Sequence, residues 1–485
     1  MNQAIALESQ TIAGWGMAVG GASQVVAPTS KEGLAAALAY AADHGLRVAL
    51  RGSGCSYGDA ACGTGKLVID LAQFHQILDF SPQTGILRGE AGVTLRQVWQ
   101  TAVAAGFWPP VVSGTMAPTL GGAASMNIHG KNAYAVGPIG EHIQALEVMT
   151  PGGQLLEVSR QQRPDLFHAI IGGAGELGLI TRVDLKLKPI YSGKLNVHAT
   201  SAPNFGALLD RFVQALPSSD YAVAWLDAFA TGRALGRGLI HTARQLAQGE
   251  DPDAKNTLQV QQQELPLHLM GVFPKAAMWR LMKPFAHPAG MRLINWAKYQ
   301  SGRWLEDGKD YQQSHGAFHF LLDYVPNWKW IYRPHGLVQH QSFVPDDRVR
   351  EVFPAILALC HKHGMPSWLA VLKRHRPDPF LLSHGLDGWS LAQDFPVTPR
   401  NREALWEMCH QMDELVMNAG GKVYFAKDAT VRPASVLQAF GAEKLLQFKA
   451  LRDELDPNGL LATDLYDRAL APAIALAQAA DCQAK

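Results

Sequence analysis

The sequence predicts an α+β fold, on three observations made in its first 190 or so residues. Apolar runs there are short, and glycines punctuate them. Two such runs within residues 144–159 are joined by Pro-Gly-Gly, which is typical of a strand–turn–strand hairpin. The G-x-G-x-x-G motif of a doubly wound dinucleotide domain is not matched, because GSGCSYG at 52–58 has Tyr57 where the third glycine belongs and does not continue as a helix.

The individual elements follow from local spacing. Residues 30–45 have the apolar period of a helix, with Thr29 or Ser30 as the N-cap. A helix also fits residues 404–421, which end in glycine as a C-cap should. The other elements expected are strands at 47–52, 66–74, 144–159 and 177–190, a strand, turn and helix at 86–106, a short helix at 165–173, and strands at 335–345, 388–397 and 420–428.

Composition limits the class of protein. The chain has 485 residues, of which 47% are hydrophobic and 18% charged, so we expect two or three globular domains. Its 43 Lys and Arg balance 42 Asp and Glu, which argues against a nucleic-acid partner. Five cysteines in no paired pattern indicate a reducing compartment and no metal site. Because no signal peptide and no long apolar run is visible, we expect a cytoplasmic protein, with peripheral membrane contact left open.

The middle of the chain differs from the first 190 residues in composition. Residues 243–265 are polar and broken by glycine and proline, so they are a candidate mobile loop. Residues 266–300 are apolar with interspersed Lys, Arg and Trp. A pair of core-packing helices is the simplest interpretation of the second segment, and a lid, a partner surface or an interfacial patch are the alternatives.

Glycines gather in four groups, each between apolar runs. The groups lie at 51–59, 113–132, 137–142 and 171–181. Glycine lets backbone N–H groups approach a ligand closely and form anion-binding nests. Any one group fits an ordinary turn, but four in one module favour a large phosphate-bearing cofactor held by several loops.

These motifs carry a family resemblance. The glycine groups, with SYGDAA, IHGKN, LVQHQ, DFPV and VYFAKD further along, resemble the vanillyl-alcohol oxidase superfamily of PCMH-type flavoproteins, and within it the decaprenylphosphoryl-ribose 2-oxidase-like branch. The resemblance implies a two-part PCMH-type FAD-binding module at 1–192 and an α+β substrate-cap domain with a central antiparallel sheet at 193–418. Residues 419–485 are then a C-terminal segment that returns to the FAD domain.

The resemblance also implies FAD as the cofactor, bound non-covalently. Relatives with covalent flavin carry His where this chain has Cys55, so a thioether to Cys55 is the open alternative. The residues implied at the cofactor are Gly52, Ser53, Gly54, Cys55, Ser56, Tyr57, Gly114, Thr115, Thr119, Gly121, Gly122, Ser125, Asn127, His129, Gly130, Asn132, Ile180 and Lys427.

Four residues are candidates for catalysis: Lys427, Tyr57, His129 and Tyr424. A lysine beside the flavin stabilises the reduced form and, if its pKa is lowered, accepts the hydroxyl proton. Either tyrosine is a candidate proton relay. Tyr424 and Lys427 are three apart and would face opposite ways on a strand, so a bend is needed for both to meet one ligand. A surface lysine and a structural histidine are the plain alternatives.

The candidates for substrate binding are Gln339, Gln341, Lys373 and Ser390. The two glutamines share one strand face, and adjacent amides suit a hydroxyl-rich ligand. Lys373 suits a phosphate. Satisfied sheet amides and a solvated lysine are the alternatives. Ser390 and Ala392 stand where the related branch has Asn and Cys, which puts the substrate in question.

The function implied is an FAD-dependent oxidoreductase that oxidises a secondary alcohol of a sugar or polyprenyl-phosphosugar by hydride transfer to flavin N5. The electrons would pass to O2, a quinone or another acceptor. The alternatives are a reductase or desaturase of a sterol-like alkene and an aldonolactone or alditol oxidase. Two alternatives belong to a different class. One is a non-catalytic FAD-binding subunit, and the other is a protein without flavin, in which the glycines serve only turns.

Overall fold

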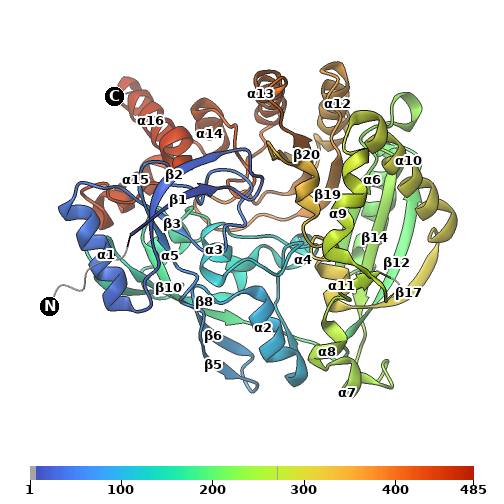
Figure 1. Ribbon diagram of the computed structural model, residues 1–485, viewed down its shortest axis with the longest axis horizontal. Helices are drawn as coiled ribbons and strands as arrows, with labels where there is room; N and C mark the ends of the chain where they lie inside the picture. Colours follow the sequence, from blue (N-terminus) through green and yellow to red (C-terminus); the bar gives the residue numbers. More distant parts are fainter. Residues whose placement is uncertain (1–6, 270, 485) are drawn as a thin grey trace.

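Two bodies of strands make up the molecule, and a layer of helices joins them (Figure 1). The computed structural model describes residues 7–269 and 271–484. The N-terminal strands form two separate sheets, and a larger sheet from the middle of the chain stands beside them. Helices and strands are both abundant and mostly segregated, so the predicted α+β class is confirmed.

The first sheet has four strands in the order β1-β2-β4-β3. Strand β4 pairs in parallel with both β2 and β3. The predicted helix lies over it: Ser30 caps the helix by accepting from the N–H of Gly33 at 3.1 Å, and Leu34 and Leu38 are buried. The bounds are β1 (Glu8–Ala13), β2 (Gly20–Val26), α1 (Lys31–Asp43), β3 (Val48–Arg51) and β4 (Leu67–Asp70).

The second sheet is antiparallel, in the order β5-β6-β10-β8-β9. It confirms the strand, turn and helix predicted at 86–106 and the hairpin at 144–159. Thr94 and Gln97 form a capping box at the helix that follows β6. The bounds are β5 (Ile77–Ser81), β6 (Ile86–Glu90), α2 (Leu95–Ala102), β7 (Phe107–Trp108), α3 (Leu120–Ser125), α4 (Ala133–Val136), β8 (Ile143–Met149), β9 (Leu155–Ser159), α5 (Pro164–Ile170), β10 (Leu179–Lys186) and β11 (Lys188–Pro189).

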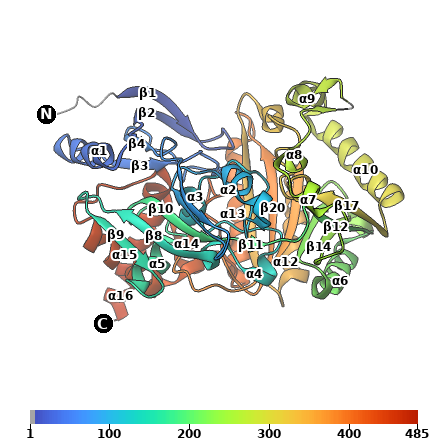
Figure 2. The same cartoon turned by 90° about the horizontal axis from the view of Figure 1, so that it is seen from below.

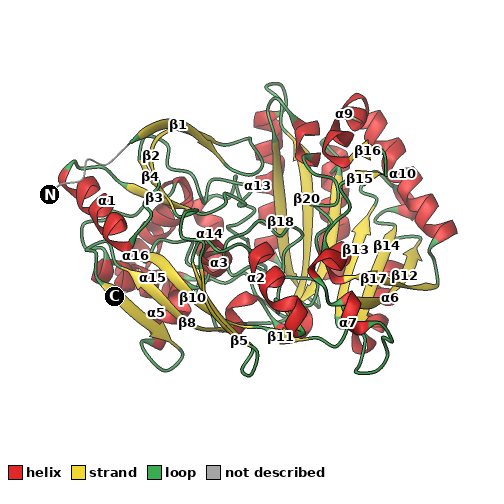
Figure 3. Ribbon diagram, turned by 60° about the horizontal axis from the view of Figure 1, so that its bottom comes forward, coloured by secondary structure: helices red, strands yellow, loops and turns green. Residues whose placement is uncertain are grey.

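The largest sheet has seven antiparallel strands in the order β17-β12-β14-β13-β19-β20-β18, seen as the tall yellow sheet of Figure 3. Its strands and neighbouring helices are β12 (Lys194–Ala202), α6 (Phe205–Ala215), β13 (Tyr221–Leu226), β14 (Gly238–Gln245), α10 (Pro288–Leu305), β17 (Lys309–Ser314), α11 (His315–His319), β18 (Leu337–Pro345), α12 (Val349–Lys362), β19 (Leu369–His375), β20 (Gly388–Pro396) and α13 (Arg402–Asn418).

The two faces of this sheet are covered differently. On β13, Ala222 and Ala224 join the main core with Leu208 of α6. The alternate residue Trp225 joins a separate cluster with Tyr299 of α10. Because side chains alternate along a strand, α6 and α10 lie on opposite faces of the sheet. Helix α10 is on the outer edge of the molecule, away from the N-terminal sheets (Figure 2).

The end of the chain returns to the first sheet. The N–H of Val48 donates to Leu460 at 2.8 Å, and the N–H of Ala462 donates back to Val48 at 2.7 Å. Helices α14 (Pro433–Phe440), α15 (Ala442–Leu455) and α16 (Ala471–Ala484) belong to this part, drawn in red beside the blue strands of Figure 1. The domain boundaries at 192 and 418 stay predictions.

Two expectations for local structure are wrong. Residues 420–428 form a bridge at Lys422 followed by a turn, not a strand. Residues 243–265 are not a free loop: they hold α7 (Ala254–Thr257) and α8 (Val260–Gln263). Gln263 is fully buried and donates to the carbonyls of Gly193 and Thr257, each at 2.9 Å, so this polar segment is anchored to the start of β12.

Residues 266–300 contain the short strands β15 (His268–Leu269) and β16 (Phe273–Pro274), helix α9 (Met278–Met282) and most of α10. Helix α10 buries Met291 and Tyr299 but leaves several large apolar side chains exposed. The interpretation as a plain core-packing helix pair therefore accounts for one side of α10 only.

Candidate functional site

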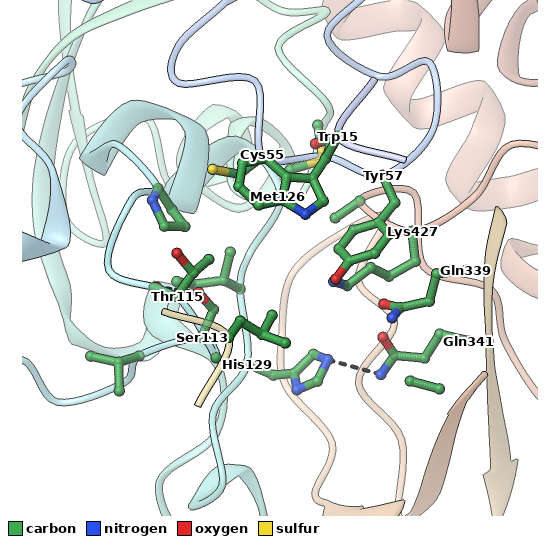
Figure 4. Close-up of a pocket in the computed structure, with 18 of the residues that line it drawn as sticks. Trp15, Cys55, Tyr57, Ser113, Thr115, Met126, His129, Gln339, Gln341 and Lys427 are labelled. Atoms are coloured by element: carbon green, nitrogen blue, oxygen red, sulfur yellow. Dashed lines mark hydrogen bonds between the residues drawn. The ribbon is translucent and has the colours of Figure 1, made fainter. Parts of the chain in front are cut away.

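A cavity of about 650 Å³ runs from the glycine loops of the N-terminal module to the seven-stranded sheet. Figure 4 shows side chains from both bodies pointing into it. Most of the residues predicted for cofactor, catalysis and substrate lie along its wall, which brings together segments more than 300 residues apart. They are Gly52, Ser53, Gly54, Cys55, Ser56, Tyr57, Gly114, Thr115, Thr119, Gly121, Gly122, Ser125, His129, Ile180, Gln339, Gln341, Lys373, Ser390, Tyr424 and Lys427.

The loop after β3 presents free backbone donors to this cavity. Gly54 has a φ of +63°, which turns the chain at a conformation that favours glycine. Among the described residues, no N–H group of residues 53–56 donates to another protein group. Amides that line a cavity without an acceptor are what an anionic diphosphate needs, so the loop fits the pyrophosphate of FAD.

Three predicted cofactor contacts are not part of the cavity wall. Asn127 is buried, donates to Ser383 Oγ at 3.2 Å and accepts from the N–H of Gly140 at 3.0 Å. Asn132 donates to the carbonyl of Pro110 at 2.8 Å, and Gly130 packs against the side chain of Asn132. Their hydrogen bonds are used within the protein, so the structure favours structural roles for Asn127, Gly130 and Asn132 over contact with the cofactor.

Residues 424–427 form a turn, so Tyr424 and Lys427 do not face opposite ways as they would on a strand. The N–H of Lys427 donates to the carbonyl of Tyr424 at 2.9 Å, which folds the chain back on itself. The N–H of Tyr57 donates to the carbonyl of Ala426 at 2.8 Å and fixes this turn to the glycine loop. As a result, the Lys427 ammonium lies 3.8 Å from the centre of the Tyr57 ring, and both face the cavity (Figure 4).

A buried acid accompanies Lys427. Asp394 of β20 is fully buried, and its Oδ1 accepts a hydrogen bond from Gln339 Nε2 at 2.5 Å. Burial lowers the pKa of Lys427 to about 7 and raises the pKa of Asp394 to about 7. Each of the two groups therefore titrates near neutral pH. Asp394 was missed as a site residue, although it stands in the DFPV motif as an acid within an otherwise apolar run.

His129 belongs to a chain of buried polar groups beneath the cavity. Gln341 Nε2 lies 3.0 Å from His129 Nε2 and donates to Ser390 Oγ at 3.1 Å, and His375 Nε2 lies 2.8 Å from the same Oγ. Burial holds the pKa of His129 well below its usual range, so the ring is neutral and accepts from Gln341. His129 and Ser390 thus fix the amide of Gln341.

Two lysines line the cavity on the side of the large sheet. Burial lowers the pKa of Lys373 to about 8, so its ammonium is retained at neutral pH but readily lost above it. Lys131 is buried, donates to the carbonyl of Phe318 and lies over the Phe318 ring, so its ammonium is already paired within the protein. Lys373, on strand β19, lines the cavity and is therefore the one of the two that is assigned to a ligand.

Cys55 lies in the cavity as a protonated thiol. Its Sγ is 3.3 Å from Ser53 Oγ, and burial raises the thiol pKa. Because the thiolate is the nucleophile, this environment works against a thioether and favours non-covalent FAD.

Other parts of the wall were not predicted from the sequence. Trp15 comes from the turn between β1 and β2, and no motif marks it. The cavity also continues over the face of the large sheet as far as α10, past residues that read as ordinary strand positions. This lobe is lined by Val223, Trp225, Leu239, His241, Leu369, Val371, Lys298, Ser301 and Gly302.

Comparisons with known proteins agree with this architecture. Residues 22–159 match the family model described as "FAD binding domain". The chain is 29% identical to decaprenylphosphoryl-beta-D-ribose oxidase of Mycolicibacterium smegmatis over 470 residues, which cover 95% of this chain and 97% of that protein. It is 29% identical to L-gulono-1,4-lactone dehydrogenase of Mycobacterium tuberculosis over 39% of this chain and 44% of that one.

A third relative, D-arabinono-1,4-lactone oxidase of Yarrowia lipolytica, is 27% identical over 42% of this chain and 38% of its own. The family match covers three of the four glycine groups, and the alignment to the ribose oxidase extends through both bodies of the molecule. The chain therefore carries an FAD-binding domain and is an FAD-dependent oxidoreductase that is similar, over nearly its whole length, to decaprenylphosphoryl-beta-D-ribose oxidase.

Proposed function

We propose that this enzyme oxidises a secondary alcohol of a sugar or polyprenyl-phosphosugar. One observation carries the proposal: a single cavity joins the free amides of the glycine loop to Lys427, Gln339 and Gln341. A hydroxyl-rich ligand held by the two amides would lie between the cofactor loop and the lysine. The alignment to the ribose oxidase covers both bodies, which supports a substrate of that kind.

The residues that line the cavity have separate roles in proton transfer and substrate binding. Lys427 as the neutral amine accepts the hydroxyl proton of the substrate, and Tyr57 and Tyr424 lie beside it as candidate relays. Gln339 and Gln341 orient the hydroxyl groups, because Asp394 and His129 hold their amides in place. Lys373 pairs with a substrate phosphate. FAD held by the glycine loop would supply the acceptor for the hydride that leaves the carbon as the hydroxyl proton passes to Lys427.

A lactone or alditol oxidase is the second candidate, because two relatives are named for lactones. Those alignments cover at most 42% of this chain, however, whereas the ribose oxidase alignment covers 95%. The residues assigned to substrate here lie on the large sheet, so the longer alignment favours the sugar substrate. We propose that O2, a quinone or another small acceptor reoxidises the flavin. We also propose a cytoplasmic location, because all five cysteines are free.

The function is tested with purified protein under anaerobic conditions. We expect a yellow protein whose flavin is released into solution by acid, and whose visible flavin band bleaches when a polyprenyl-phosphopentose is added. Bleaching by an aldonolactone but not by the phosphosugar would move the assignment to the second candidate. Colourless protein that takes up no added FAD would remove the flavoenzyme assignment altogether.

The rate of flavin reduction should depend on pH through Lys427. Because burial lowers its pKa to about 7, the amine is protonated below that pH and cannot accept a proton. The rate constant is therefore expected to rise on the order of tenfold per pH unit up to about pH 7 and then to level off. Rapid-mixing measurements across this range, with Lys427→Gln as the pH-independent control, check it. A wild-type rate that falls as the pH rises through 7 would contradict the base role.

A further inference from the structure

The outer side of helices α9 and α10 carries an unusual set of exposed apolar side chains. We call this region the α9–α10 surface and define it by Leu281, Phe285, Leu293, Trp296 and Trp304. Trp296 is 49% exposed and Trp304 is 78% exposed. Tryptophan side chains are mostly buried in folded proteins, so two with this exposure on one helix are unusual. A cluster of this kind on one helix pair marks an interaction site.

The same segment carries charge of one sign. Residues 266–305 contain six Lys and Arg and no Asp or Glu, in a chain that has 43 Lys and Arg and 42 Asp and Glu overall. Arg292 and Arg303 are exposed on α10, and Arg280 and Lys283 are exposed at and just after α9. At 100° per residue, Arg292, Trp296 and Arg303 fall within one narrow stripe of α10, so cations border the apolar side chains directly.

Two kinds of occupant suit an exposed apolar surface, a second copy of the chain or another partner. A two-fold dimer would place this surface against itself and bring its cations together without any acid from residues 266–305 to pair with them. An anionic bilayer supplies the opposite charge and a headgroup boundary in which Trp and Leu are buried while Arg stays hydrated. Charge complementarity thus favours the membrane.

The cavity reaches the other side of α10. Lys298, Ser301 and Gly302 line it from that helix, and the Lys298 ammonium lies 4.5 Å from the Trp225 ring centre on the sheet below. Opposite them the wall is mostly apolar, with Val223, Trp225, Leu239, Leu369 and Val371. Helix α10 is therefore a single layer between the apolar lobe of the cavity and the α9–α10 surface.

We propose that the α9–α10 surface docks the enzyme on an anionic phospholipid bilayer, and that the apolar lobe beneath α10 takes the hydrocarbon tail of a lipid-linked substrate. This deepens the proposed function and rests on it for the substrate. No helix in residues 7–269 and 271–484 is long and apolar enough to span a bilayer. The docking places the cavity next to the phase in which a polyprenyl-phosphosugar is dissolved.

Sedimentation of the holoenzyme with vesicles tests the docking. We expect binding to vesicles of equal phosphatidylglycerol and phosphatidylcholine, weaker binding at high salt, and little binding to phosphatidylcholine alone. The pair Trp296→Ser and Trp304→Ser should lower the partition coefficient on the order of tenfold or more. The matched control is Leu78→Ser with Leu155→Ser, two apolar residues on β5 and β9 that are 47% and 45% exposed, close to the 49% of Trp296, and this variant should bind as the wild type does.

The flavin content of each variant shows whether it has folded. Equal vesicle binding by the wild type and the tryptophan variant would overturn the proposal. A wild-type protein that does not bind anionic vesicles and instead dimerises through these residues would also overturn it. Vesicle binding needs no turnover, so a protein that docks but oxidises no phosphosugar would refute the proposed function alone. A protein that oxidises a short-tailed phosphosugar but does not dock would refute this inference alone.

Discussion

Replacement of Lys427 by methionine is expected to slow flavin reduction by substrate on the order of 10²–10⁴-fold, the usual contribution of a positioned general base. Methionine has nearly the length of lysine but cannot accept a proton. The flavin should still bind, because the loop amides of residues 53–56 are not altered. Rapid mixing of holoenzyme with saturating substrate in the absence of oxygen measures the rate directly.

The fold should survive this change. Burial raises the pKa of Asp394 to about 7 even with Lys427 present, so its carboxyl becomes neutral when the neighbouring cation is removed. An uncompensated buried charge is thereby avoided. Flavin content and the thermal midpoint of the variant, compared with those of the wild type, check this step separately from catalysis.

Lys373→Met is the matched comparison, because it removes a second buried cation from the same cavity. Lys373 is assigned to substrate phosphate, so its loss should raise KM while the rate at saturation stays within about tenfold. If Lys427→Met reduced its flavin as fast as the wild type, Lys427 would have no part in the chemistry. Equal losses in both variants would mean that the two lysines act only as a field of positive charge.

Features that depend on local chemistry were predictable from the sequence. The N-cap at Ser30 and the glycine loop at 52–56 both reflect what a short stretch of backbone does regardless of its surroundings. The same holds for Gln339 and Gln341, because strand alternation alone puts them on one face, and that face does line the cavity. Motifs of this kind located most of the candidate site.

The errors lie where distant parts of the chain decide the structure. Residues 420–428 have a strand-like composition, but the N–H of Tyr57 bonds to Ala426 and the chain turns there instead. The segment 243–265 is polar, yet Asp251 is buried because Ser192 and Thr257 both donate to it. The pairing of Asp394 with Gln339 could not be predicted, since the two residues are 55 positions apart. Propensity is overridden in each case by a tertiary contact.

Arg468→Ala is expected to be the most destabilising single change outside the core. The Arg468 guanidinium donates to Asp59 at 2.7 and 3.0 Å, to Asp428 at 2.6 Å and to the carbonyl of Val431 at 2.8 Å. The side chains of Asp59 and Asp428 are only 8% and 9% exposed, so removal of the arginine leaves two largely buried negative charges without a counter-cation. Breaking a buried ion pair from one side costs about 3–5 kcal/mol.

This ion pair also holds the active turn in place. Asp59 follows the glycine loop, Asp428 follows Lys427, and Arg468 ties both to the returning C-terminal segment. A loss of Arg468 should therefore lower flavin retention and turnover together with stability. Arg468→Lys keeps the charge but not the planar fork that reaches two carboxylates, so an intermediate loss is expected.

The control is Arg432→Ala, on the neighbouring segment. Arg432 pairs with Glu407 and Glu414 at the surface, where ion pairs contribute about 0–1 kcal/mol. Urea denaturation followed by tryptophan fluorescence, with flavin release recorded in the same samples, compares the two variants. If both arginine variants shifted the midpoint equally, burial of the Asp59 and Asp428 charges would not be the cause. If Arg468→Ala kept its flavin at wild-type affinity, the C-terminal return would be dispensable for the shape of the site.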